Sequence, residues 1–244
     1  MKIIGIIPAR YASTRFPGKP LVDINGKSMI RRVYEQALKA SSLHYVVVAT
    51  DDNRIADHVR EFGGHAILTA NNHQSGTDRC AEVVSKEGSF DIAINIQGDE
   101  PYIDPSQIDL LASCFREAST QIATLVKEIK DSEELFNNNT PKVLLNTHQE
   151  AIYFSRATLP FLRAIPVEKW LQHHKFYKHI GIYGYRSEIL KALTRLPVSS
   201  LERAESLEQL RWIENGYRIK TAETTVETLA IDEPKDLQKV NQIK

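Results

Sequence analysis

The first polar loop of the chain carries three cations whose spacing suits the binding of a phosphate chain. Arg10, Arg15 and Lys19 all lie in residues 8–20. Guanidinium groups bind phosphate oxygens in pairs, and an ammonium group adds a point charge. Gly18 and the small residues of this loop let backbone N–H groups approach an anion. We therefore expect a polyphosphate ligand here; the alternative is a solvated basic loop whose proline and glycine residues only form turns.

A second polar loop contains a carboxylate that suits a metal ion. Asp99 follows the apolar run of residues 91–97 and stands between Gly98 and Glu100. A carboxylate at the end of a strand suits a hard cation such as Mg²⁺, which would bridge phosphate oxygens. We favour Asp99 over Glu100 because a shorter side chain has less freedom. Taken alone, Asp99 fits an ordinary turn, and the cationic loop makes the metal hypothesis the stronger one.

Asp232 is a further carboxylate to consider. It ends an apolar stretch, and Pro234 follows two residues later, which is typical of an N-cap that opens a helix. An N-cap could also contribute a second oxygen to a metal ion. Spacing alone favours the capping role over metal binding.

Apolar and amphipathic stretches alternate in the first half of the chain and would position both loops. Near-continuous apolar runs, typical of strands buried on both faces of a sheet, occur at residues 2–7, 45–50, 65–68 and 91–97. Helices are expected at residues 28–38, which Ser28 caps, and at residues 52–62 and 77–86. Ligands bind beyond the carboxyl ends of parallel strands, and both polar loops follow such strands.

The second half of the chain is less regular. Strands are expected at residues 121–129, 141–146 and 177–185, and helices at residues 206–215 and after Asp232. We predict a single α/β domain over residues 1–244, with a mostly parallel sheet flanked by helices. A β-rich insertion would occupy about residues 125–185.

Composition excludes several classes of protein. The 31 Lys and Arg residues balance 31 Asp and Glu residues, so net charge gives no support for nucleic acid or anionic membrane as a partner. Two cysteines are too few for a disulfide scaffold or a cysteine-rich zinc site. The N-terminal apolar run is too short for a signal peptide, and no apolar run could span a bilayer. No G-x-G-x-x-G follows the first strand, which argues against a dinucleotide oxidoreductase. We expect a soluble, cytoplasmic protein.

Seven segments together resemble the sugar-acid cytidylyltransferases, over nearly the whole chain. They are IIPARYASTRFPGKPL at 6–21, VATDD at 48–52, SGTDR at 75–79, NIQGDEP at 95–101, YFSRATLP at 153–160, HIGIYGY at 179–185 and LEQLRW at 207–212. The resemblance is strongest to members that act on 3-deoxy-D-manno-octulosonate (Kdo). It implies a Rossmann-like nucleotidyltransferase fold and Mg²⁺-dependent transfer of CMP from CTP to the anomeric hydroxyl of Kdo, which releases pyrophosphate and serves lipopolysaccharide synthesis. It also implies a cytoplasmic homodimer formed largely by the β-rich insertion.

The resemblance also implies roles for individual residues. Positions around the triphosphate are matched by Ala9, Arg10, Ser13 and Lys19, and the segment against cytosine and ribose by Gln74, Ser75 and Gly76. The magnesium carboxylates are matched by Asp99 and Asp232, so the catalytic candidates are Arg10, Lys19 and Asp99. Positions around the sugar acid are matched by Arg15, Gln97, Arg156, His179, Tyr183, Glu208 and Gln209. The glycine-rich approach that the family often has before its last aspartate is absent before Asp232.

Three alternatives stay open at this point. The chain could transfer CMP to another acidic sugar, such as a sialic acid or the 8-amino analogue of Kdo. It could be a uridylyl- or guanylyltransferase of the same fold. It could also be a non-catalytic nucleotide-binding module, although the set of Arg10, Lys19 and Asp99 argues against this.

Overall fold

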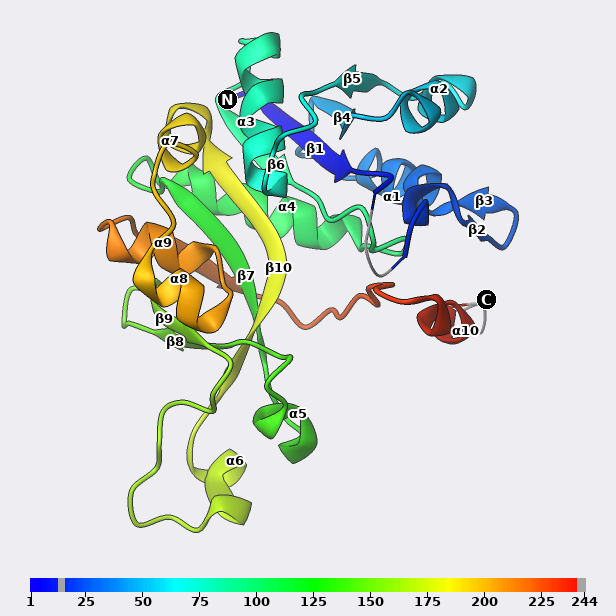
Figure 1. Cartoon of the computed structure of the whole chain (residues 1–244). Helices are drawn as coiled ribbons and strands as arrows, with labels where there is room; N and C mark the ends of the chain where they lie inside the picture. The colour runs from blue at the N-terminus through cyan, green and yellow to red at the C-terminus, as the bar shows by residue number, and fades with distance from the viewer. Residues whose placement is uncertain (13–15, 241–244) are drawn as a thin grey trace.

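A mixed sheet forms the centre of the computed structural model, which describes residues 1–12 and 16–240 (Figure 1). Within those residues the sheet has nine strands, and the main path runs in the order β11-β7-β10-β6-β1-β4-β5. The strands are β1 (Ile3–Ala9), β4 (Tyr45–Thr50), β5 (Ala66–Leu68), β6 (Ile92–Asn95), β7 (Ile122–Glu128), β8 (Lys142–Leu145), β9 (Ala151–Ser155), β10 (Tyr177–Arg186) and β11 (Ile219–Glu223). A separate small pair joins β2 (Asp23–Ile24) to β3 (Lys27–Ser28).

Strand directions divide the sheet into two parts. β1 pairs in parallel with β4 and β6, and β4 pairs in parallel with β5. β10 runs antiparallel to both β6 and β7, and β7 pairs in parallel with β11. The predicted α/β class is confirmed, and each predicted strand lies within two residues of an observed one at either end. β9 and β11 are strands that the sequence analysis did not predict.

Helices cover both faces of the sheet. They are α1 (Met29–Ala37), α2 (Asn53–Glu61), α3 (Gly76–Glu87), α4 (Pro105–Ser113), α5 (Ser132–Phe136), α6 (Trp170–His173), α7 (Ser187–Leu193), α8 (Ser200–Glu205), α9 (Gln209–Glu214) and α10 (Leu237–Val240). Short 3₁₀ turns are η1 (Lys19–Leu21), η2 (Cys114–Arg116), η3 (Val167–Lys169) and η4 (Pro234–Asp236).

The alternation of side chains along β1 explains this two-sided packing. Ile3 and Ile7 point into a core shared with α1, α2 and α4, whereas Ile4 and Ile6 join α3, α7 and α9 on the opposite face. Successive side chains of a strand point to opposite faces, so an unbroken apolar run is buried on both faces of the sheet. The carboxyl end of β1 is consequently fixed from both sides, and the loop that follows it starts from a rigid point.

Two predictions about helix ends are wrong. The helix expected over residues 206–215 begins only at Gln209, as α9, because Ser206 adopts a left-handed conformation (φ 53°, ψ 47°) that ends the preceding helix α8. Asp232 does not cap the last helix. Glu233 takes that place, and its side chain and that of Asp236 each accept a hydrogen bond from the other's backbone N–H. Asp232 Oδ1 lies 3.9 Å from Lys19 Nζ.

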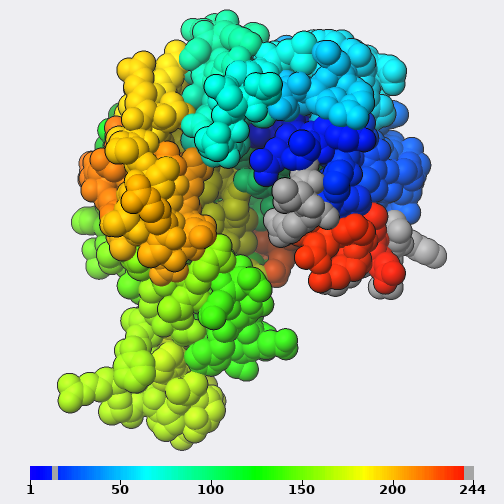
Figure 2. Space-filling model, viewed as in Figure 1, coloured from blue at the N-terminus to red at the C-terminus, as the bar shows by residue number. Residues whose placement is uncertain are grey.

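The β-rich segment around residues 125–185 continues the main sheet. The hairpin of β8 and β9 extends from β10, and residues 156–176 with α6 project from the body of the molecule (Figures 1 and 2). A small apolar cluster stabilises this projection, in which Trp170 and Phe176 stack at 6.1 Å between ring centroids. Phe161 packs edge-on against Trp170 and remains 76% exposed.

Candidate active site

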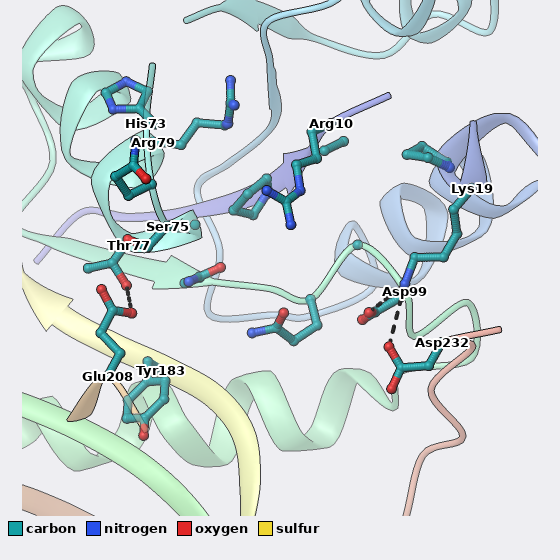
Figure 3. A pocket seen from close by; sticks show the side chains of 18 residues that line it. Arg10, Lys19, His73, Ser75, Thr77, Arg79, Asp99, Tyr183, Glu208 and Asp232 are labelled. Atoms are coloured by element: carbon teal, nitrogen blue, oxygen red, sulfur yellow. Dashed lines mark hydrogen bonds and ion pairs between the residues drawn. The ribbon is translucent and has the colours of Figure 1, made fainter. Parts of the chain in front are cut away.

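A cavity of about 420 Å³ opens at the carboxyl ends of β1 and β6. It lies in the hollow of the face shown in Figure 2, and Figure 3 shows its side chains. The lining residues are Pro8, Ala9, Arg10, Lys19, Pro20, His73, Gln74, Ser75, Gly76, Thr77, Arg79, Asn95, Gln97, Gly98, Asp99, Tyr183, Glu208 and Asp232. Three separate stretches of the first half and three residues of the second half thus meet in one place.

Most of the site residues that the sequence suggested line this cavity. They are Ala9, Arg10, Lys19, Gln74, Ser75, Gly76, Gln97, Asp99, Tyr183, Glu208 and Asp232. Ser13 and Arg15 lie outside the described residues. Arg156, His179 and Gln209 are not among the lining residues.

Lys19 lies between the two aspartates of the site. Its Nζ donates to Asp99 Oδ2 at 2.8 Å and lies 3.9 Å from Asp232 Oδ1. The same ammonium donates to the backbone oxygen of Ile231 at 2.8 Å. Gly18, with φ 72°, makes the left-handed turn into η1, and its N–H donates to Tyr11 O. This turn positions Lys19, the first residue of η1, beside the two aspartates. The two carboxylates, which are far apart in sequence, therefore face one cation (Figure 3).

Gly98 lets the loop after β6 pass close to β1. A Cβ atom at this position would lie 2.8 Å from the backbone oxygen of Pro8, closer than real Cβ atoms approach. Only glycine avoids this clash without a shift of the backbone, and the next residue is Asp99. The glycine thus sets the distance between the acidic loop and the strand end that carries Arg10.

Arg10 is exposed and ready for a ligand. Within the residues that the structure describes, its guanidinium makes neither a hydrogen bond nor an ion pair. Figure 3 shows Arg10 on the same side of the cavity as Lys19, above Asp99. An uncommitted guanidinium at the mouth of a cavity suits an anionic ligand.

The N-terminus of α3 forms the opposite wall. Ser75 and Asp78 make a capping box, which fixes Gly76 and Thr77 at the start of the helix. Thr77 Oγ1 donates to Glu208 Oε2 at 2.8 Å. Burial raises the pKa of Glu208 above its usual range, against the opposing effect of this hydrogen bond. The carboxyl group is therefore a partly buried acceptor that faces the cavity from the start of α9.

Two other lining side chains, Asn95 and Tyr183, carry buried polar atoms that no described residue pairs. Gln97 Nε2 donates to the backbone oxygen of Gly181 at 2.7 Å, so the side-chain amide of Gln97 is held against β10. Asn95 Oδ1 and the hydroxyl of Tyr183 are buried and have no hydrogen-bond partner among the described residues. Buried polar atoms are normally paired, so such atoms in a cavity wall are suited to a polar ligand.

Arg156 and His179 lie outside the lining of the cavity. Arg156 Nε donates to the backbone oxygen of Glu205 at 2.7 Å, so the side chain joins β9 to the end of α8. His179 Nε2 lies 3.0 Å from Thr124 Oγ1, and its ring lies 5.1 Å from that of Tyr183. Burial lowers the pKa of His179 to about 3, so the imidazole is neutral near neutral pH.

The structure adds Thr77, Arg79, Asn95 and His73 to the lining, which sequence reasoning missed. Arg79 is 5% exposed, hydrogen-bonds to Thr69 and lies 3.5 Å from the Asp51 carboxylate. A signal was present, because Thr77 and Arg79 belong to the same SGTDR segment as Gly76. Asn95 is a polar residue inside an otherwise apolar strand.

The donor set around Lys19 also fits a divalent cation. Two carboxylates, Asp99 and Asp232, already converge on a positive charge. Among the described residues there is no group of three or more His, Cys, Asp or Glu side chains that would make a complete protein cage. Mg²⁺ characteristically takes one or two carboxylates and completes its shell with water and substrate phosphates. The fit is therefore to a metal that shares its ligands with a nucleotide.

Comparisons with known proteins agree with this chemistry. A family model described as cytidylyltransferase matches residues 4–227. The chain is 57% identical to a 3-deoxy-manno-octulosonate cytidylyltransferase of Parabacteroides distasonis over 98% of this chain and 96% of that protein. It is 56% identical to the protein of the same name from Bacteroides thetaiotaomicron, with the same coverage. A solved CMP:2-keto-3-deoxy-manno-octonic acid synthetase in complex with CTP superposes with a TM-score of 0.92 at 45% identity, over 99% of this chain and 97% of the other. Within the described part of the chain, no helix is long and apolar enough to cross a membrane.

Proposed function

The chain belongs to the cytidylyltransferase family, and we propose that it transfers CMP from CTP to the anomeric hydroxyl of Kdo and releases pyrophosphate. One observation carries the proposal: the cationic residues after β1 and the carboxylate after β6 face a single cavity whose opposite wall is the N-terminus of α3. Relatives and a solved CTP complex with this activity share nearly the full length of the chain.

Arg10 and Lys19 are proposed to bind the triphosphate. Both line the cavity, and Arg10 is exposed. Their charges would oppose the negative charge that builds up on pyrophosphate as it leaves. We place cytosine and ribose along Gln74, Ser75 and Gly76, because this segment lines the same cavity beside the buried Arg79. Ala9, Ser13 and Arg15 belong to the same loop as Arg10 and stay candidates for contacts to the nucleotide or the sugar.

Asp99 and Asp232 are proposed to hold Mg²⁺. Asp99 is the more buried of the two, with a side chain 26% exposed against 50% for Asp232. When bound there, Mg²⁺ would neutralise charge on phosphate oxygens and acidify a hydroxyl that coordinates it.

The sugar acid is proposed to lie against Gln97, Tyr183 and Glu208, on the side of the cavity where β10 and the α8–α9 corner meet. Glu208 offers an acceptor for sugar hydroxyls, held in place by Thr77. His179 and Gln209 lie next to this wall and would act from behind it, and Arg156 could pair the carboxylate of Kdo after a local movement. These roles remain predictions.

The reaction is a single displacement at phosphorus. The anomeric oxygen of Kdo forms a bond to the α-phosphorus and gives up its hydroxyl proton to water. The bond from that phosphorus to the bridging oxygen breaks, and pyrophosphate leaves with the electron pair. Two anions must approach each other for this to occur. Arg10 and Lys19 lower the repulsion, and the cavity holds the two reactants in line; such positioning contributes roughly 7–11 kcal/mol in favourable cases.

A pyrophosphate-release assay tests the proposal. Purified protein with CTP, Kdo and Mg²⁺ should release pyrophosphate, whereas ATP, GTP and UTP should give little. A small panel of acidic sugars, including a sialic acid and 8-amino-Kdo, separates the sugar alternatives. Release with UTP or GTP in preference to CTP would contradict the proposal, and no release with any pair would favour a non-catalytic module.

We also propose a cytoplasmic homodimer that supplies CMP-Kdo for lipopolysaccharide synthesis. Apolar side chains exposed on the β9 and α6 region support the dimer, since Phe161 is 76% and Ile152 is 53% exposed. The use of CTP, a cytoplasmic nucleotide, supports the location. Light scattering coupled to size exclusion should give twice the mass of 27.7 kDa, and Phe161→Ser together with Ile152→Ser should shift it towards the single chain.

A further inference from the structure

Lys19 has a position that its role in triphosphate binding does not require. Its ammonium donates to Asp99 Oδ2 and to the backbone oxygen of Ile231, both at 2.8 Å, and Asp232 Oδ1 is 3.9 Å away. The side chain is only 15% exposed. Each oxygen in this arrangement approaches the same nitrogen, so the ammonium occupies the place where the two carboxylates converge.

A divalent ion and an ammonium cannot both use this place. Mg²⁺ requires carboxylate oxygens at about 2.0–2.1 Å and near-octahedral geometry. An ammonium that already donates to Asp99 would repel the incoming ion, and in a partly buried site this repulsion is screened less than in water. For a metal to bind to both aspartates, Lys19 must first move away from them.

A triphosphate offers Lys19 a second set of anionic partners. Arg10 lines the same cavity and is exposed, so the phosphate chain would lie within reach of both cations. Movement of the ammonium from Asp99 to a phosphate oxygen would release the Asp99 carboxylate at the moment when further metal ligands arrive with the nucleotide.

We propose that Lys19 is an internal counter-cation that keeps metal ions off Asp99 and Asp232 until a nucleotide binds. This inference rests on the proposed metal and triphosphate roles of these residues. It assigns an order to the site: metal binds weakly to the free protein and enters with, or after, CTP. Because coupling between two ligands is reciprocal, the lysine makes metal binding depend on CTP and CTP binding depend on the metal to the same extent.

The experiment measures metal binding without nucleotide. Mn²⁺, whose free form is counted by electron paramagnetic resonance, is titrated into the full-length protein in the wild-type, Lys19→Gln and Arg10→Gln forms. The two variants lose the same charge in the same cavity, but only Lys19 contacts Asp99. Lys19→Met is a second neutral variant in case glutamine disturbs the fold, and melting temperatures check all forms.

We expect Lys19→Gln to bind Mn²⁺ about tenfold more tightly than the wild type, as for loss of one competing charged hydrogen bond, and Arg10→Gln to stay within about twofold. Adding Asp99→Asn to Lys19→Gln should remove the gain. The proposal is overturned if Lys19→Gln binds Mn²⁺ no more tightly than Arg10→Gln, or if the gain survives Asp99→Asn. Failure of the proposed function would appear separately, as absence of pyrophosphate release by the wild type.

Discussion

Thr228 Oγ1 donates a hydrogen bond to Glu100 Oε2 at 2.6 Å, joining two parts of the chain that are 128 residues apart. Next to it, the N–H of Ile231 donates to the backbone oxygen of Asp99 at 2.9 Å. The two bonds fix the irregular segment before Asp232 against the loop after β6. The spacing of Asp99 and Asp232 therefore depends on Glu100, the carboxylate that sequence reasoning set aside.

Thr228→Val should loosen this connection while keeping the shape of the side chain. Loss of one partly buried hydrogen bond should lower the free energy of unfolding by about 1 kcal/mol. We expect the Mg²⁺ concentration for half-maximal rate to rise several-fold, with a smaller change in the KM for CTP. Thr228→Ser keeps the hydroxyl and should behave like the wild type. An unchanged Mg²⁺ dependence in Thr228→Val would show that the bond does not position Asp232.

Substitution of Asp99 should affect the rate more than substitution of Asp232. Asp99 is more buried than Asp232 and makes the closer contact with Lys19. Its substitution therefore removes the better positioned of the two proposed metal ligands. Asp99→Asn and Asp99→Ala should lower kcat on the order of 100-fold, as for loss of one electrostatic contact to the transition state. Asp232→Asn should lower it less. Near-normal turnover of the Asp99 variants in saturating Mg²⁺ would remove the proposed metal role.

Gly98→Ala tests the close approach of two strand ends. The added methyl would meet Pro8 O at 2.8 Å, so the backbone must shift, at about 1–3 kcal/mol of stability. Activity should fall because Asp99 moves with it. Gly76→Ala is the matched control, since its methyl would have nearest neighbours at 3.5 Å, an ordinary contact. Equal unfolding free energies for the two variants in urea would contradict this explanation.

His179 should stay neutral well below the pH at which an exposed histidine takes up a proton. Thr124 donates its hydroxyl proton to Ile182 O at 2.7 Å, so the His179 Nε2–H is the donor in their contact. The pKa falls from 6.5 to about 3 on folding, so the unfolded chain binds the proton more readily. Stability from this residue is complete above pH 6.5 and decreases as the pH falls towards 3. Nitrogen NMR of the ring should show the Nε2–H form unchanged from pH 8 to 5, and titration within that range would contradict the burial argument.

Arg156→Ala should separate the two substrates. If Arg156 pairs the carboxylate of Kdo, the KM for Kdo should rise about tenfold or more, as for loss of a charge-assisted contact, while the KM for CTP changes little. Arg156→Lys keeps the charge but not the paired geometry, so its KM for Kdo should lie between those of the wild type and Arg156→Ala. Similar increases in both KM values would indicate instead that Arg156 acts by joining β9 to the end of α8.

The strands and helix caps could be predicted from the sequence because neighbouring residues in the chain determine them. The apolar run before Pro8 is buried on both faces, and Ser28 accepts the N–H of Arg31 as a helix cap. Prediction failed at Ser206, where a non-glycine residue adopts a left-handed turn, and at Asp232, where the neighbouring Glu233 takes the capping role. At Asp232 the deciding interaction is itself local, the capping box that Glu233 makes with Asp236.

The sequence by itself determined which residue types follow which strands, and hence that a cationic loop and an acidic loop would meet at one edge of a sheet. Only the tertiary structure decided which side chains touch: Lys19 reaches Asp99 across 80 positions and Ile231 across 212. It also buried Arg79 in the cavity wall and kept Arg156 out of it. Strand and helix signals arise from neighbours in the chain, whereas contacts between distant segments exist only once the sheet has brought its strand ends together.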